Sequence, residues 1–100
     1  MSAYLLGAID VRDREAYDRY QRAAAAALAP YTVEFLAVDP APVMLEGRQP
    51  AGHLFVIRFG SMDDARAFYA CEAYVRAREI RHEAADTLHL MLLRGTDEVT

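Results

Sequence analysis

Lysine and tryptophan are missing from this chain, and positive charge is thinly spread. All 11 basic residues are arginines, they are scattered among 15 carboxylates, and the formal net charge is −4. A nucleic-acid-binding surface needs clustered positive charge, because binding releases the counterions of the phosphates. The distribution of charge therefore argues against a nucleic acid as partner.

Cysteine is almost absent, since Cys71 is the only one. A single thiol excludes an internal disulfide and a zinc knuckle, and a lone cysteine is usually a small hydrophobic residue unless a neighbouring base activates it. The three histidines, His53, His82 and His89, are 29 and 7 residues apart. Zinc and iron sites favour shorter spacings. We therefore predict no metal and no cofactor, haem included.

Long apolar runs are also lacking. No stretch approaches the roughly 18 to 20 apolar residues of a membrane-spanning helix, so we expect no membrane as partner. The segment Met1–Ala8 has neither the basic start nor the long apolar stretch of a secretory signal, and we expect a cytoplasmic protein. Neither a glycine-rich phosphate loop nor a nucleophile elbow occurs.

What the chain does contain is enough apolar sequence for one small core. It has 100 residues, and 54% of them are hydrophobic, although 19 of these are Ala and bury little area each. A domain of this size leaves much of its surface in water, so association with a second copy would add stability. We predict one domain over residues 1–95, followed by a polar tail at 96–100.

Apolar periodicity divides the chain into alternating strands and helices. We predict strands near residues 3–10, 31–39, 53–59 and 87–94, and helices near 13–29 and 61–85. The second helix is expected to break around Cys71–Ala73. A short edge strand at Val43–Glu46 and an exposed turn at Gly47–Gly52 complete the pattern.

The order strand, helix, strand, strand, helix, strand is that of the ferredoxin-like βαββαβ arrangement. This is an α+β fold, in which an antiparallel four-stranded sheet carries both helices on one face. The other face of the predicted sheet is apolar too. We therefore predict a homodimer in which two such sheets face each other.

Several segments carry a resemblance to a known family, and together they span nearly the whole chain. They are Tyr4–Gly7 with Ile9–Asp10, the pair Tyr17 and Tyr20, Leu45–Gly47, Phe59–Ser61 with Ala65–Tyr69, and Tyr74 with Arg81. In these segments the chain resembles the small bacterial proteins of the domain-of-unknown-function family thirteen-thirty. That family belongs to the dimeric α/β-barrel superfamily, and the resemblance implies that fold.

The same superfamily includes cofactor-free monooxygenases, isomerases, aromatic cyclases and haem enzymes, so the fold does not fix the function. The chain also departs from the family. Thr32–Val33 stands where two glycines are usual, Cys71–Tyr74 where Ser-Pro-Glu-Tyr is usual, and His53 where Arg is common. Such changes either weaken the transfer of a family ligand site or mark a specialised substrate.

Five polar residues fall where the strands and helices should converge: Glu46, His53, Tyr69, Tyr74 and Arg81. As a catalytic set, His53 is the candidate base, and Tyr69 and Tyr74 are hydroxyl donors to developing negative charge. Arg81 is the candidate binding residue for an anion, and Glu46 either orients it or competes for it.

Each candidate also has a structural interpretation. Tyr69 is otherwise a core aromatic residue with its hydroxyl at the rim, and Arg81 otherwise pairs with Glu46 or a carboxylate of its own helix. His53 is otherwise a solvated residue at the start of a strand. The role of His89 is open between the dimer interface and the barrel interior. Tyr17 and Tyr20 are expected to pack the first helix on the sheet.

Three functions fit this sequence. The first is a small cofactor-independent enzyme of the isomerase, cyclase or oxygenase type, acting on an acidic or aromatic metabolite in bacterial secondary or catabolic metabolism. The second is a protein that binds such a small molecule without turnover. The third is a structural dimerisation module. A pocket that contains the candidate residues would favour the first two.

Overall fold

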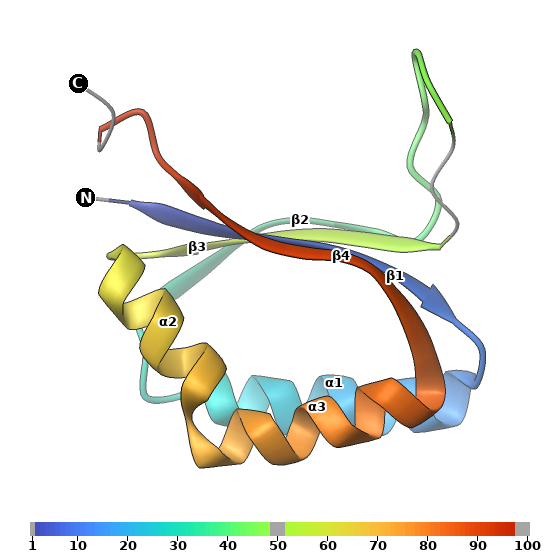
Figure 1. Cartoon of the computed structure of the whole chain (residues 1–100), viewed down its shortest axis with the longest axis horizontal. Helices are drawn as coiled ribbons and strands as arrows, with labels where there is room; N and C mark the ends of the chain where they lie inside the picture. The colour runs from blue at the N-terminus through green and yellow to red at the C-terminus, as the bar shows by residue number, and fades with distance from the viewer. Residues whose placement is uncertain (1, 49–51, 98–100) are drawn as a thin grey trace.

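The computed structural model describes residues 2–48 and 52–97, which fold into a sheet and three helices (Figure 1). In chain order the elements are β1 (Ala3–Val11), α1 (Arg14–Leu28), β2 (Val33–Asp39), β3 (His53–Phe59), α2 (Met62–Ala70), α3 (Glu72–Ala84) and β4 (Ala85–Arg94). The strands lie in the order β2-β3-β1-β4, and every neighbouring pair is antiparallel. The predicted ferredoxin-like α+β fold is confirmed.

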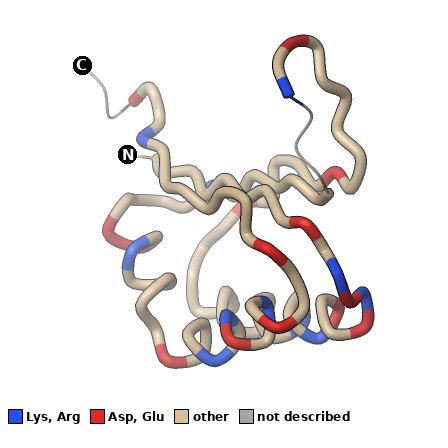
Figure 2. The backbone as a smooth tube through the Cα atoms, turned by 45° about the vertical axis from the view of Figure 1, so that its right-hand side comes forward, with Lys and Arg blue, Asp and Glu red and all other residues tan. Residues whose placement is uncertain are grey.

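The molecule has two layers, with all three helices on one face of the sheet (Figure 1). The inner face of the sheet carries buried residues such as Leu5, Ile9, Ile57 and Phe59. The outer face has no covering element among the described residues. Figure 2 shows that charged residues are frequent along the helices and sparse across the middle of the sheet.

The helices begin where the sequence supplies capping side chains. The carboxylate of Asp13 accepts a hydrogen bond from the backbone N–H of Ala16 at 3.2 Å, and the hydroxyl of Ser61 accepts one from Asp64 at 3.0 Å. Each cap satisfies a donor that the first helical turn leaves free, which stabilises a helix by about 1 kcal/mol. These caps fix where α1 and α2 begin.

The predicted break in the second helical stretch occurs at Cys71, whose backbone is extended (φ −68°, ψ 150°). Its N–H donates to the carbonyl of Phe68, and its own carbonyl accepts from Val75, so the turn loses few hydrogen bonds. The change of direction lays α3 alongside α1 (Figure 1). Because of it, Tyr74 and Arg81 of α3 face Tyr20 of α1.

Two glycines allow close approaches that other residues would block. A Cβ at Gly7 would overlap the ring of Phe55, which lies across β1 on the inner face of the sheet. Gly52 has φ +84°, and a Cβ there would collide with the backbone of Ile9. Gly52 thus lets β3 begin next to β1, and this places His53 in the sheet.

The predicted edge strand at Val43–Glu46 is wrong. These residues belong to a loop that projects from the sheet (Figure 1), and their side chains are exposed. Pro40 and Pro42 account for the difference, because proline lacks the N–H that a strand ladder needs. Part of the predicted turn Gly47–Gly52, residues 49–51, lies outside the described residues.

Smaller differences occur at the ends of elements. β2 begins at Val33 rather than at 31, and β4 begins at Ala85 because α3 passes directly into it. The backbone N–H of Gly95 donates to Ser2 at 2.9 Å, and Asp97 accepts a bond from the Ser2 N–H at 3.0 Å. The start of the predicted tail therefore lies against β1, and residues 98–100 are outside the described part. No helix within residues 2–48 and 52–97 is long and apolar enough to cross a membrane.

Candidate functional site

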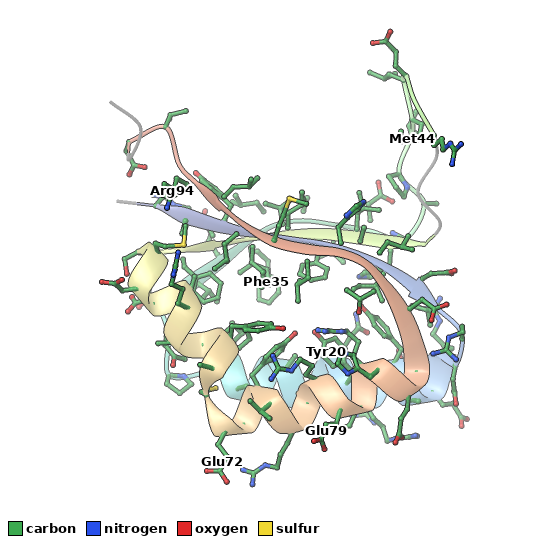
Figure 3. All side chains as sticks on the ribbon, viewed as in Figure 1. Tyr20, Phe35, Met44, Glu72, Glu79 and Arg94 are labelled. Atoms are coloured by element: carbon green, nitrogen blue, oxygen red, sulfur yellow. The ribbon has the colours of Figure 1, made fainter. Side chains whose placement is uncertain are left out.

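A cavity of about 110 Å³ lies between α1 and the β2–β3 half of the sheet. Figure 3 shows Tyr20 on the helix layer and Phe35 on the sheet, both directed into the space between the layers. Most of the wall is apolar. The full lining is Tyr17, Tyr20, Gln21, Ala24, Ala25, Leu28, Phe35, Val38, His53, Phe55 and Ile57.

His53, at the start of β3, is the imidazole of this cavity. It is 9% exposed, and its ring packs edge-on against Tyr17 with 5.6 Å between ring centroids. Burial and the positive charge of Arg14 lower the pKa of His53, and Asp39 opposes them only in part. The imidazole is therefore neutral near pH 7, and a neutral imidazole can accept a proton.

Arg81 lies behind the cavity and is 2% exposed. Its Nη1 donates to the hydroxyl of Tyr74 at 2.5 Å and to that of Tyr20 at 3.4 Å, and its Nε donates to the hydroxyl of Thr87 at 3.1 Å. The guanidinium carbon also lies 5.5 Å from the centroid of the Tyr20 ring. The cation is thus held by neutral oxygens and by an aromatic face.

No carboxylate pairs with this buried cation within residues 2–48 and 52–97. The ion pairs of the described residues join exposed side chains, as between Arg12 and Asp86 at 3.3 Å. Burial alone lowers the pKa of Arg81, but the oxygens of Tyr74 and Tyr20 outweigh it and raise the pKa above the usual value. Arg81 therefore keeps a charge that lacks a neutralising partner, which is favourable for binding an anion.

Two tyrosines connect Arg81 with the cavity. The hydroxyls of Tyr20 and Tyr74 are 2.9 Å apart and buried. Burial and the neighbouring Tyr20 raise the pKa of Tyr74, so it stays protonated at any physiological pH. Tyr20 belongs to both groups, since it lines the cavity and its hydroxyl contacts Arg81.

The structure brings three of the five predicted site residues together. His53 lines the cavity, and Tyr74 and Arg81 lie behind it, reached through Tyr20. The expectation that Arg81 pairs with Glu46 or a carboxylate of its own helix is wrong for the described residues. The docking of α3 on α1 instead buries Arg81 among tyrosine hydroxyls.

Tyr69 and Glu46 lie elsewhere. Tyr69 is 39% exposed, stacks under the guanidinium of Arg78 and lines a second cavity, between α2 and the strands β1 and β4. Its ring still touches the far side of Tyr74, at 5.6 Å between centroids. Glu46 is exposed on the projecting loop, so it is not placed to orient a ligand in the cavity of its own chain.

Sequence reasoning missed Tyr20 as a functional residue. Tyr17 and Tyr20 do pack α1 on the sheet, as expected, and both are at least 95% buried. What the stripe pattern could not show is where the Tyr20 hydroxyl goes. The available signal was chemical, because a buried tyrosine hydroxyl needs a hydrogen-bond partner and Arg81 is the nearby unpaired cation.

Comparison with solved structures shows the same fold in other proteins. A protein of unknown function from Rhodopseudomonas palustris aligns with a TM-score of 0.76 at 20% identity, covering 94% of this chain and 82% of that chain. A dimeric ferredoxin-like protein of unknown function from Jannaschia sp. CCS1 aligns with a TM-score of 0.70 at 18% identity, covering 95% of this chain and 100% of that chain.

A third similar structure is SnoaB, a cofactor-independent oxygenase from Streptomyces nogalater. It aligns with a TM-score of 0.67 at 10% identity, covering 94% of this chain and 92% of that chain. No curated protein matches this sequence. Residues 2–96 match the family described as Domain of unknown function (DUF1330), and the chain belongs to that family.

Proposed function

We propose that this protein is a cofactor-independent enzyme that acts on a small acidic or aromatic molecule bound between α1 and the sheet. One observation carries the proposal: a buried arginine without a carboxylate partner in the described residues lies one tyrosine away from an apolar cavity that contains a neutral imidazole. Apolar walls with a few convergent polar groups are typical of small-molecule sites.

The hydroxyl network supports a donor role for Tyr20. Arg81 has no acceptor and donates to the oxygens of both Tyr20 and Tyr74. When the Tyr74 hydroxyl also donates to Tyr20, the proton of Tyr20 remains free to point into the cavity. A hydroxyl that accepts two bonds, one of them from a cation, is a stronger donor. Tyr20 is therefore suited to stabilise negative charge on a ligand oxygen.

His53 supplies the proton acceptor in this proposal. A nitrogen of the neutral imidazole takes a proton from an acidic C–H or O–H bond of the substrate, and the electron pair moves onto the substrate oxygen near Tyr20. Return of the proton to another atom completes an isomerisation. Alternatively, the enolate carbon attacks a carbonyl carbon of the same substrate, whose C=O π bond breaks and whose oxygen takes the electron pair and then the proton from His53. In an oxygenation the enolate carbon adds instead to dissolved O₂, which is reduced to a substrate hydroperoxide that takes that proton.

The size of the cavity restricts the substrate. A buried apolar cavity of about 150 Å³ is enough for benzene, and the cavity here is about 110 Å³. One ring therefore fits only where the wall is open. Phe35 and Val38 on edge strand β2 are 57% and 52% exposed, so the larger part of a substrate would lie there. SnoaB, with the same fold, is a cofactor-independent oxygenase, which supports the reaction class.

Binding without turnover is the second candidate. No hydrogen bond to the ring of His53 is formed by residues 2–48 and 52–97, whereas a catalytic imidazole is usually oriented through its second nitrogen. A structural dimerisation module is the third. It would leave the buried charge of Arg81 without a use.

We also propose a homodimer with the outer sheet faces in contact. That face carries Leu6, Val56, Met91 and Leu93, and the last two are 39% and 46% exposed. An apolar face of this kind is unusual on a monomer. The Jannaschia protein of the same fold is dimeric. A mass that stays monomeric in light scattering at micromolar and higher concentrations would end this proposal.

Phenylpyruvate is a suitable probe for the enzyme, because it is acidic, aromatic and able to enolise. We expect the protein to bind it and to accelerate exchange of its methylene protons in D₂O, followed by proton NMR. His53→Gln should still bind the probe but lose the acceleration. Binding by the wild type without faster exchange would favour the second candidate, and absence of binding to phenylpyruvate and to benzoate would favour the third.

A further inference from the structure

The loop between β2 and β3 forms an arm, which we define as residues 40–48. It rises from the sheet on the side opposite the helices, in both views of the molecule (Figures 1 and 2). The cavity described above lies on the other side, between the sheet and α1. The arm therefore extends away from the cavity of its own chain.

The tip of the arm is apolar and solvated. Leu45 is 91% exposed, Val43 is 84% exposed and Met44 is 36% exposed. Burying a side chain such as Leu or Val is favourable in water, so consecutive exposed residues of this type indicate a surface that is covered when the protein is assembled.

The base of the arm is restrained by two prolines and one hydrogen bond. Pro40 and Pro42 fix two backbone angles, and the carboxylate of Asp39 accepts a hydrogen bond from the N–H of Ala41 at 2.9 Å. A segment that is restrained before binding loses less conformational entropy when it docks. The base of the arm therefore has less conformational freedom than an unrestrained loop.

The size of the outer sheet face can be compared with the area that a stable interface buries. Four strands spaced about 4.8 Å apart, with a mean length of about 27 Å, give a flat footprint of about 500 Å². A standard stable interface buries about 800 Å² of accessible surface per partner. The accessible surface of this face is larger than its flat footprint, so the sheet alone is at most about the size of a standard interface, and an apolar arm on the same side adds contact area.

From these observations we propose that the arm of each copy packs against a second copy of this chain. Val43 and Leu45 contact that copy beside the sheet interface. The inference rests on the homodimer proposed above. Two-fold symmetry gives each copy one arm and one surface that receives the arm of its partner. Both contacts form within one dimer, so no open chain of molecules results.

The first test compares dimer dissociation constants from sedimentation equilibrium. The double variant Val43→Ser with Leu45→Ser should raise the dissociation constant at least tenfold, while Glu46→Ser, an exposed polar change on the same arm, should leave it unchanged. A wild-type dimer with an unchanged constant in the double variant would overturn the role of the arm and leave the dimer intact. A monomeric wild type would overturn both.

The second test uses the absence of tryptophan from the chain. In Leu45→Trp the new indole is the only one, so its emission reports the arm alone. We expect the emission to shift to shorter wavelength as the protein concentration rises. The midpoint of this shift should fall at the concentration where the measured mass changes from monomer to dimer. If the indole of the dimer emits at the wavelength of a solvated indole, the proposal is contradicted. This result does not depend on whether the serine variants fold.

Discussion

Replacing Arg81 with methionine separates a binding role for this residue from a purely structural one. Methionine fills a similar volume without charge. In the free protein the change removes the hydrogen bonds to Tyr74, Tyr20 and Thr87, but it also removes a buried cation. Hydrogen bonds to charged groups are worth about 1.5 to 3 kcal/mol each, and the desolvation of a buried ion costs several kcal/mol. The two effects oppose each other, so we expect a stability change within about 2 kcal/mol.

Anion binding should change much more. A ligand oxygen about 2.7 Å from the hydroxyl of Tyr20 lies within about 6 Å of Arg81 Nη1, given the 3.4 Å between these protein atoms. Two unit charges about 6 Å apart interact by about 3 kcal/mol at an effective dielectric constant of about 20. This corresponds to a roughly 100-fold loss of affinity in Arg81→Met.

The assay is a titration of wild type and Arg81→Met with benzoate and with its uncharged analogue benzamide, followed by NMR shifts of the protein. Benzoate affinity should fall about 100-fold, and benzamide affinity should change little. Equal benzoate affinities in two folded proteins would refute the reasoning. If Arg81→Met does not fold, Tyr20→Phe tests the same link, because it keeps the ring and removes the donor, with an expected loss of roughly 10- to 150-fold.

Three further predictions concern pH, assembly and packing. The pKa of His53 is lowered from 6.5 in the folded state, so the stability tied to the neutral imidazole is complete above that pH and is lost as the pH falls through the lower, folded-state value. The free energy of unfolding measured with urea should fall on acidification through this range, and it should fall more for the wild type than for His53→Phe. Parallel pH dependences in the two proteins would contradict this. Met91→Arg should give a monomer of unchanged helix content, by light scattering and circular dichroism, because it places charge on the outer sheet face. Gly7→Ala should destabilise the fold by about 1 to 3 kcal/mol, because its Cβ would overlap the ring of Phe55, and an unchanged urea midpoint would show that the ring moves freely.

Elements with a regular apolar period could be predicted from sequence. Alternation along His53–Phe59 located β3, and the stripe through Tyr17 and Tyr20 located α1, because one face of each is buried and the other is not. The break at Cys71 was also predicted. Val43–Glu46 was assigned to a strand wrongly, because a few apolar residues do not show whether a neighbouring strand is available to pair with them.

The candidate site was less predictable because it depends on contacts between distant residues. The bond between Arg81 and Tyr20 joins positions 61 apart in the chain and exists only because α3 docks on α1. A local sequence pattern identifies Arg81 as a cation on a helix. It does not predict which side chains contact the guanidinium in the folded protein. Glu46 was predicted to belong to the site because of its chemistry. It lies on the arm, which extends away from the cavity, so it is not part of the site in its own chain.

The energetics of Arg81 connect the fold with a function. A hundred-residue domain has a small core, and burying a guanidinium in it has a desolvation cost that the hydroxyls of Tyr74, Tyr20 and Thr87 offset. Replacing the guanidinium with an apolar side chain removes both the desolvation cost and these hydrogen bonds, so the two effects oppose each other. In the proposed function an anion in the cavity would give this charge a partner in a region of low dielectric constant. The proposal therefore predicts that ligand affinity depends on Arg81, and that Tyr20, which contacts Arg81 and lines the cavity, transmits the effect.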